Sequence, residues 1–321
     1  VPISNLISTN LPMEQLSKKL LEKQSMLSGY PAVRQFADTS AVMVNAKDIY
    51  PKEFVTLDGV KTFVKYKIDD KILVAAAVLK ESDSPLDSLF QDFLSDNKHK
   101  LPKIEDVMYE DRMGLVAWVQ GERVLLGSRN LLQKYGIEPP AQSMEEKFKA
   151  GGKTVTYFAH SGVLLAMFVT TLKPSPKVQN ELLFAQENGI SLLVSSNDYN
   201  ITSEKIGDDF GLFYRTIKVL SPGLSTACDE ATSHKEQSSR AYLATTGKFL
   251  SMLHSVTSCV RINSMFAVSV VIQLLGVIIG FGLAAVISFF AGVQAVGAVA
   301  FIIYSLFWAA VSVIVPLISK H

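Results

Sequence analysis

Short apolar runs bounded by turn residues recur along the first two thirds of the chain, and they predict buried strands. One run covers 41–44 and a second covers 190–195. Runs without polar alternation are typical of parallel strands that helices cover on both faces. Helices with one apolar stripe, or rich in Ala, are predicted at 11–27, 71–80 and 177–188. The alternation of the two kinds of segment predicts an α/β fold.

The segment 52–149 has a denser pattern of short strands, which predicts a small α/β insert. The pair Asp58-Gly59 predicts a hairpin turn between its first two strands. Strands are predicted here at 54–57, 61–68, 104–109, 113–119 and 123–126, and a further hairpin at 154–159 and 163–170.

Two long apolar runs, at 264–290 and 295–318, dominate the last part of the chain. Each is longer than the roughly 20 residues that a membrane span needs, and no acid or base lies between Arg261 and Lys320. Residues 291–294 are the predicted turn. Basic residues before and after the runs predict that both ends are cytoplasmic. We therefore expect a helical hairpin in a lipid bilayer, in the plasma membrane, below a cytoplasmic head.

Charge and cysteine content narrow the expectations further. The 321 residues include 31 Lys and Arg against 30 Asp and Glu, so net charge gives no indication of a nucleic-acid partner. Cys228 and Cys259 have neither a disulfide pattern nor metal-ligand spacing. The chain starts at Val1 without a signal peptide, and we expect a fragment or a processed product.

The strand at 36–44, with the residues after it, resembles the phosphorylation strand of the P-type ATPases. In that family the strand ends in DKTGTLT, and its Asp accepts phosphate from ATP. The alignment puts Asn45 at the Asp, Ala46 at the Lys, Lys47 at the first Thr and Asp48 at the Gly. The apolar strand matches the family pattern, but the catalytic residues that follow it do not.

An Asn at the nucleophile position changes what the resemblance implies. Asn45 cannot form an acyl phosphate, because that step needs a carboxylate. A second register puts Asp38 at the nucleophile, but Asp38 then precedes the apolar strand. The plain alternative is that Asn45 is only a turn residue.

The insert also resembles the nucleotide-binding domain of the heavy-metal-type members. Ser84, predicted to cap a helix, falls on the His of SEHPL that touches adenine. Gly114 falls on the second Gly of GxG, and Gly127 on the Gly of VLxGNR. The resemblance implies that these three positions belong to a nucleotide-binding site whose contacts with ATP are partly lost, since Ser84 replaces the His. Ordinary turn glycine is the alternative for Gly114 and Gly127.

The return into the first domain resembles the same family. Lys173 keeps the positive charge of DPLRP, whose Asp-Pro is replaced by Thr170-Thr171. Ser196 and Asp198 fall on the Thr and Asp of TGD, which implies a haloacid-dehalogenase-type phosphate site with a hydroxyl and a helix N-terminus. The alternative is that both residues cap the helix that Thr202 begins.

The family's GDGxND motif, which supplies the carboxylates for Mg²⁺, is absent from the sequence. Residues 221–239 are polar and predicted to be a loop. The expected division is a lead-in helix at 1–31, a phosphorylation-like domain at 32–51 and 150–239, an inserted nucleotide-binding-like domain at 52–149, a linking helix at 240–262 and a transmembrane hairpin at 263–321.

The resemblance implies a P-type ATPase relative with degenerate catalytic motifs, a membrane pseudo-pump whose head regulates or binds a partner membrane protein. Weak or absent binding of ATP and Mg²⁺ is expected. One alternative is an active cation pump that uses Asp38 or Asp48 as nucleophile, with Lys47 or Lys173 as phosphate clamp. Another is a non-enzymatic membrane anchor. The sequence contains no predicted metal site, and the transported cation is not indicated.

Overall fold

The computed structural model describes residues 3–82, 84–90, 102–232, 242–291 and 297–318. These fall into two compact units. One unit combines Val1–Ser40 with Ser238–His321, and the other is Ala41–Gln237. Each is described by itself.

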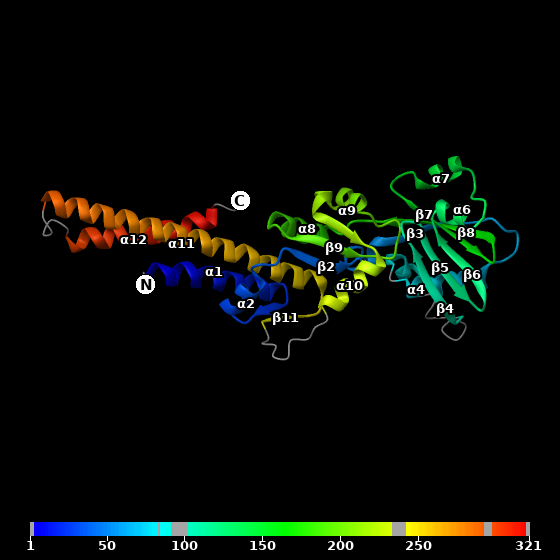
Figure 1. Ribbon diagram of the computed structural model, residues 1–321, viewed down its shortest axis with the longest axis horizontal. Coiled ribbons are helices and arrows are strands. Elements are labelled where there is room, and N and C mark those ends of the chain that lie inside the picture. Colours follow the sequence, from blue (N-terminus) through cyan, green and yellow to red (C-terminus); the bar gives the residue numbers. More distant parts are fainter. Residues whose placement is uncertain (1–2, 83, 91–101, 233–241, 292–296, 319–321) are drawn as a thin grey trace. The chain divides into compact units, whose positions relative to one another are not determined.

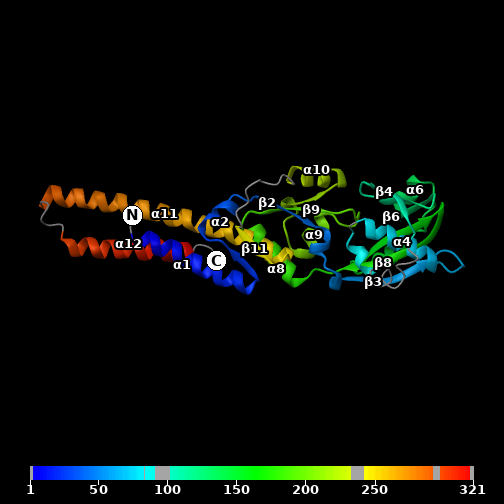
Figure 2. The same cartoon turned by 90° about the horizontal axis from the view of Figure 1, so that it is seen from below.

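The first unit is mainly helical (Figure 1, Figure 2). Its elements are α1 (Ile3–Glu22), α2 (Tyr30–Phe36), α11 (Phe249–Ala291) and α12 (Ala298–Ile318), with an antiparallel pair of β1 (Ser25–Leu27) and β11 (Leu243–Thr245). Side chains of α1, α2 and α11 form its core. The predicted linking helix is wrong in two respects, because 243–245 forms a strand and α11 continues into the apolar run without a break. No Pro interrupts α11, so its hydrogen-bond ladder can continue.

Helix α11 has 43 residues and is therefore about 65 Å long, roughly twice the hydrocarbon core of a bilayer. Leu253, Val256 and Phe266 in its first half are buried, whereas Val277 and Phe281 farther along are exposed. By length and composition, α11 is the one helix in the described ranges that could cross a membrane, while α12 is shorter over its described side chains. The predicted turn beyond Ala291 and Lys320 lie outside the described residues.

Aromatic side chains join the two apolar helices. The Tyr304 hydroxyl donates to the carbonyl oxygen of Gly276 at 2.5 Å. A Cβ at Gly276 would lie 2.8 Å from the Trp308 ring, and one at Gly280 would lie 2.8 Å from the Tyr304 ring. Glycine at these two positions lets the rings approach the α11 backbone, as small residues do in membrane helix pairs.

The second unit contains a small parallel sheet with the order β10-β9-β2, formed by β2 (Ala41–Asn45), β9 (Ser191–Ser195) and β10 (Ile217–Leu220). Its helices are α3 (Ala46–Ile49), α8 (Pro176–Glu187), α9 (Ser203–Phe210) and α10 (Pro222–Thr232). The predicted loop at 221–239 is wrong over α10, because a polar composition with Pro in the first turn is compatible with an exposed helix.

A six-stranded antiparallel sheet completes this unit (Figure 1), with the order β3-β8-β7-β6-β5-β4. Its strands are β3 (Val55–Thr62), β4 (Ile104–Glu110), β5 (Gly114–Val119), β6 (Glu122–Gly127), β7 (Thr154–His160) and β8 (Val163–Leu172), and its helices are α4 (Asp69–Glu81), α6 (Arg129–Lys134) and α7 (Gln142–Lys149).

Two sequence-based expectations for the large sheet need correction. Asp58 and Gly59 do not turn the chain, because β3 runs through them with a register shift against β8. Such a bulge absorbs an extra residue without reversing the strand. In addition, β7 and β8 belong to this sheet, although the sequence assigned 150–239 to the other domain. Local pattern predicts a hairpin and does not indicate which sheet it joins.

Candidate functional site

The carboxyl ends of the three parallel strands lie at one edge of the small sheet. Asn45 at the end of β2 is in register with Ser195 at the end of β9, and Leu220 of β10 is in register with the same Ser195. Ser196 and Asp198 follow directly. In open parallel sheets this edge is where ligands bind. The fold therefore brings Asn45 and the loop 196–198 to the same edge of the sheet.

The side chain of Asn45 caps a short helix. Its Oδ1 accepts a hydrogen bond of 2.9 Å from the backbone nitrogen of Lys47, at the start of α3. This is the usual role of Asn at a helix N-terminus. The contact agrees with the interpretation of Asn45 as a turn residue.

Lys47 forms an ion pair that the sequence did not predict. Its Nζ lies 3.0 Å from Oδ2 of Asp87 in η2 (Pro85–Leu89). Asp87 is 7% exposed, and its Oδ1 has no hydrogen-bond partner among the described residues. Lys47 and Asp87 are 40 positions apart, so no local pattern links them. The one signal in the sequence was the position of Asp87 in the first turn of the helix that Ser84 caps.

Asp198 is buried and held by the segment that carries Ser84. The Ser84 hydroxyl donates to Oδ2 of Asp198 at 2.8 Å, and Oδ1 accepts from the backbone and side-chain nitrogens of Asn200 at 2.9 and 3.1 Å. Burial raises the pKa of Asp198, and the hydrogen bonds from Asn200 and Ser84 oppose that rise.

Ser196 and Asp198 do not cap α9. The Ser196 hydroxyl accepts from the backbone nitrogen of Asp198 at 3.1 Å, which closes a tight turn. Thr202 is the cap, because its Oγ1 accepts from the backbone nitrogen of Lys205 at 3.1 Å. The capping alternative is therefore wrong, and the turn instead presents Asp198 to Ser84.

Ser84, Gly114 and Asp198 line one small cavity, together with Thr156 of β7. Its volume is about 10 Å³, which is the space that one water molecule needs. Two of the predicted nucleotide-contacting residues, Ser84 and Gly114, thus share a cavity with Asp198 of the predicted phosphate loop, whereas Gly127 does not line it. Sequence reasoning missed Thr156, which lies in a strand assigned to the other domain.

Gly114 and Gly127 are paired across β5 and β6. A Cβ at Gly114 would lie 2.3 Å from the Leu126 carbonyl oxygen, and one at Gly127 would lie 2.2 Å from the Met113 carbonyl oxygen. Gly114 also has φ of +136°, which side chains rarely adopt. The close approach of two strands is a sufficient reason for both glycines.

The remaining predicted site residues lie apart from this cavity. Lys173 is exposed after β8, and its backbone nitrogen donates to the Phe54 carbonyl oxygen at 2.9 Å. Asp38 is exposed before β2, at the amino end of that strand, and Asp48 is exposed in α3. None of the three lines the cavity of Ser84 and Asp198.

The residues present do not fit ATP with Mg²⁺ in this arrangement. The cavity is too small for a nucleotide, and Asp198 is the one carboxylate in its lining. Its oxygens already accept three hydrogen bonds. Nor does any group of three His, Cys, Asp or Glu that could hold a metal occur within the described ranges.

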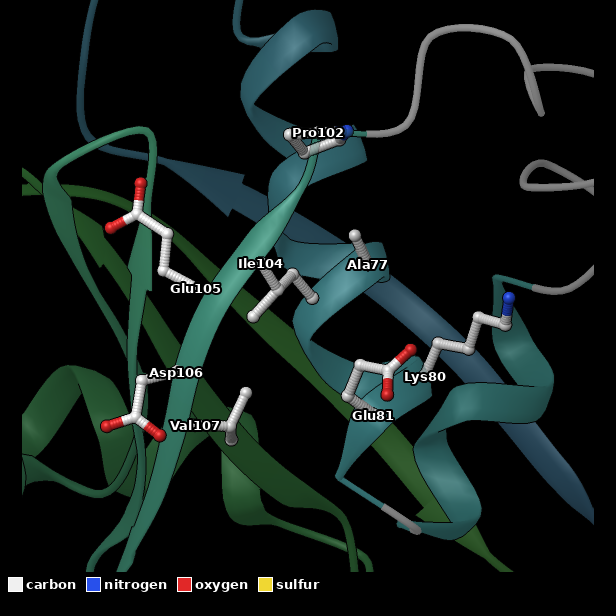
Figure 3. A pocket seen from close by; sticks show the side chains of 8 residues that line it. All are labelled: Ala77, Lys80, Glu81, Pro102, Ile104, Glu105, Asp106 and Val107. Carbon is white, nitrogen blue, oxygen red and sulfur yellow. The ribbon is translucent and has the colours of Figure 1, made fainter.

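A larger groove lies elsewhere, between α4 and the edge strand β4 (Figure 3). It encloses about 570 Å³. Ala77 and Ile104 face one another across it, with Lys80 and Glu81 on the α4 side. The largest space among these thus shares no lining residue with the cavity of Ser84 and Asp198.

No family model matches this chain. The chain is similar to the "Copper-exporting P-type ATPase" of Bacillus subtilis (strain 168), with 26% identity over 162 residues, which are 49% of this chain and 20% of that protein. It is also similar to the "Copper-exporting P-type ATPase" of Vibrio cholerae (serotype O1), with 25% identity over 150 residues, 46% of this chain and 16% of that protein. The match thus spans a fifth or less of the length of these curated relatives.

Solved structures give a weaker likeness. A zinc-transporting PIB-type ATPase in the E2·Pi state aligns with a TM-score of 0.41 and 14% identity, over 98% of this chain and 55% of that one. The catalytic domain of the CPx-ATPase CopB-B aligns with a TM-score of 0.39 and 13% identity, over 68% of this chain and 75% of that one.

Proposed function

This chain is related to the P-type ATPases, and from that relationship we propose a membrane protein whose head has lost the phosphorylation chemistry of the family. The head then serves as a regulatory or partner-binding module for another membrane protein. The observation that carries the proposal is Asn45, which ends β2 where the family has its nucleophile and whose amide oxygen caps α3.

The chemistry at this sheet edge supports the proposal. An acyl phosphate requires attack by a carboxylate oxygen on phosphorus, and the amide of Asn45 has no such oxygen. Lys47, beside it, is paired with Asp87. Asp198 is hydrogen-bonded to Ser84. The charged groups beside Asn45 and in the loop 196–198 thus already have partners within the protein, and phosphoryl transfer would have to displace them.

Nucleotide binding would need a rearrangement of the same contacts. The cavity between Ser84 and Asp198 holds only about 10 Å³, so the hydrogen bond between these two residues must open before a ligand can enter. This applies to residual binding of ATP at Ser84, Gly114 and Gly127 and to residual binding of phosphate at Ser196 and Asp198. We propose that such binding is weak and that Mg²⁺ binding depends on it.

The membrane part of the proposal rests on α11. Its second half exposes apolar side chains over more than the length of a span. We propose that this half and α12 lie in the bilayer, with the head on the cytoplasmic side of the plasma membrane. The same proposal divides the head into two domains, with the insert extended from 52–149 through β8 to Leu172, because β7 and β8 pair within its sheet. The relatives' names describe copper export.

Phosphorylation by ATP tests the proposal directly. The full chain in detergent is mixed with γ-labelled ATP and Mg²⁺ and quenched in acid. We expect no acid-stable label that hydroxylamine removes, because no carboxylate ends β2.

A hydroxylamine-sensitive phosphoprotein would overturn the proposal and support an active cation pump. Loss of that label in Asp38→Asn or in Asp48→Asn would then identify the nucleophile. If no label forms and no membrane protein co-purifies from native membranes, the alternative of a simple membrane anchor gains support.

A further inference from the structure

We propose that a lysine-lined cavity at the β3 edge of the six-stranded sheet binds a phosphate monoester of a small organic molecule. The cavity encloses about 260 Å³. Its lining includes Asp58, Lys61, Lys147, Phe148, Lys153 and Val169.

Three separate segments bring positive charge to this cavity. Lys61 comes from β3, Lys147 from α7 and Lys153 from the residues before β7. Asp58 is the single acid in the lining. It accepts a hydrogen bond from the Thr171 hydroxyl and lies 3.9 Å from Lys153.

The lining therefore carries a formal excess of two positive charges, three lysines against one aspartate. Lys61 and Lys147 are exposed and form no ion pair with any residue that the structure describes. A phosphate monoester carries about −1.5 to −2 charges near neutral pH, which matches this excess.

The cavity lies on the other face of the sheet from the cavity of Ser84 and Asp198. Lys61 pairs with Met167, whereas Thr156 pairs with Phe168. Residues paired in an antiparallel sheet share a face, and successive residues alternate between faces. Lys61 and Met167 therefore face one side and Thr156, which lines the other cavity, faces the opposite side. The two sites are distinct.

The floor of the cavity is apolar and suits an organic body attached to the phosphate. Phe148 is half-buried and packs on the core cluster that includes Val169, itself 4% exposed. The volume is slightly below the roughly 300–1,000 Å³ of typical small-molecule pockets. The ligand is thus no larger than about a nucleoside monophosphate.

The groove between α4 and β4 does not offer the same chemistry. Its lining has Lys80 against Glu81, Glu105 and Asp106, which gives a formal excess of negative charge. Figure 3 shows Glu81 on the α4 side and both other acids on the β4 side. A dianion is repelled there, so Lys80 provides a matched control.

Calorimetry on the full chain in detergent tests the proposal, with AMP as the probe and adenosine and inorganic phosphate for comparison. We expect AMP to bind more tightly than either and to weaken as salt rises above 0.15 M. Lys61→Gln and Lys147→Gln should each weaken AMP binding by about fivefold, the upper range for an exposed ion pair. Lys80→Gln should leave it unchanged.

Several results would overturn this site. These are no AMP binding at millimolar concentration, equal affinity for AMP and adenosine, unchanged AMP affinity in the double variant K61Q/K147Q, or a loss caused by Lys80→Gln instead. Both lysines are exposed, so the variants should fold, and thermal melting checks this.

Discussion

Asp198 shows how the environment of one residue fixes its behaviour. The residue is 5% exposed, and its carboxyl group accepts hydrogen bonds from Ser84 and Asn200. Burial nevertheless raises its pKa. A carboxyl group whose pKa is higher in the folded state than in the unfolded state contributes to stability at low pH, where it is protonated in both states. That advantage is lost as pH rises from the ordinary carboxyl value, about 4, through the folded value.

The raised pKa of Asp198 leads to the first prediction. Asp198→Asn removes the titrating group, so wild type should lose stability relative to the variant as pH rises from about 4 to 7. Thermal melting across this range measures the difference. Asp208→Asn, an exposed neighbour in α9, serves as the control and should track wild type. A constant gap between wild type and Asp198→Asn at every pH would contradict the prediction.

Gly127 gives the second prediction at this scale. In Gly127→Ala, the added Cβ meets the Met113 carbonyl oxygen at 2.2 Å and the Leu131 side chain at 2.8 Å. Overpacking of this kind destabilises by about 1–3 kcal/mol. Urea unfolding should show that loss.

Gly59→Ala is the matched control, because its Cβ would meet nothing within 4 Å. Its stability should change by less than about 1 kcal/mol. If both variants lost the same free energy of unfolding, the steric explanation for glycine at position 127 would be wrong.

At the scale of elements, the side-chain contacts of Glu145 connect α7 with α6 and with the large sheet. Its Oε2 lies 2.8 Å from Arg129 of α6 and accepts from the Tyr157 hydroxyl of β7 at 3.0 Å, and its Oε1 lies 2.7 Å from Lys149. Burial opposes ionisation, but the hydrogen bonds from Lys149, Arg129 and Tyr157 prevail and lower the pKa of Glu145. The same contacts position Lys147 and Phe148 beside the proposed anion cavity.

Glu145→Gln should therefore destabilise the protein by about 2 kcal/mol near neutral pH, the range of a charged hydrogen bond. The loss should shrink as pH falls below about 4, because a carboxyl group with a lowered pKa contributes above its unfolded value and not below its folded value. Glu146→Gln, at an exposed neighbouring position, should have little effect. Equal melting shifts for the two variants at pH 7 would refute this role.

At the scale of the whole molecule, the chain combines an α/β unit with a helical unit whose longest helix is half buried and half apolar-exposed. The first half of α11 packs with α1 and α2, and its later residues present Val277 and Phe281, 60% and 78% exposed. An exposed stripe of this kind marks a membrane surface when it is long enough to span.

Val277→Lys should reduce membrane integration, since a charge near the middle of a span costs about 2.5–3.5 kcal/mol. Alkaline carbonate extraction of cell membranes measures this as a larger soluble fraction. Met108→Lys, at a 49% exposed position of β4, is the control and should stay in the membrane fraction. Unchanged extraction of Val277→Lys would contradict a bilayer location for this half of α11.

The sequence alone determined those features that depend on local pattern. The presence of strand β2, the cap at Thr202 with its helix, and the apolar stretch of α11 all follow from side-chain period, capping chemistry and hydropathy, which act within a few turns. The burial of β2 was predicted only in part, because Val42 and Val44 are buried whereas Ala41 is exposed. The neutral residue at 45 is likewise a fact of the sequence, and in the proposed alignment it occupies the position at which the family's chemistry needs a carboxylate.

Only the tertiary structure decided which distant groups meet. Ser84 and Asp198 are 114 positions apart, and Lys47 and Asp87 are 40 apart, so no local pattern links them. The assignment of β7 and β8 to the large sheet, and hence the place of Thr156, depends on strand pairing. Pairing selects among partners by packing over the whole sheet, whereas periodicity states only that a strand is present. For the same reason the lysines of the proposed anion cavity, from β3, α7 and the approach to β7, come together only in the folded chain.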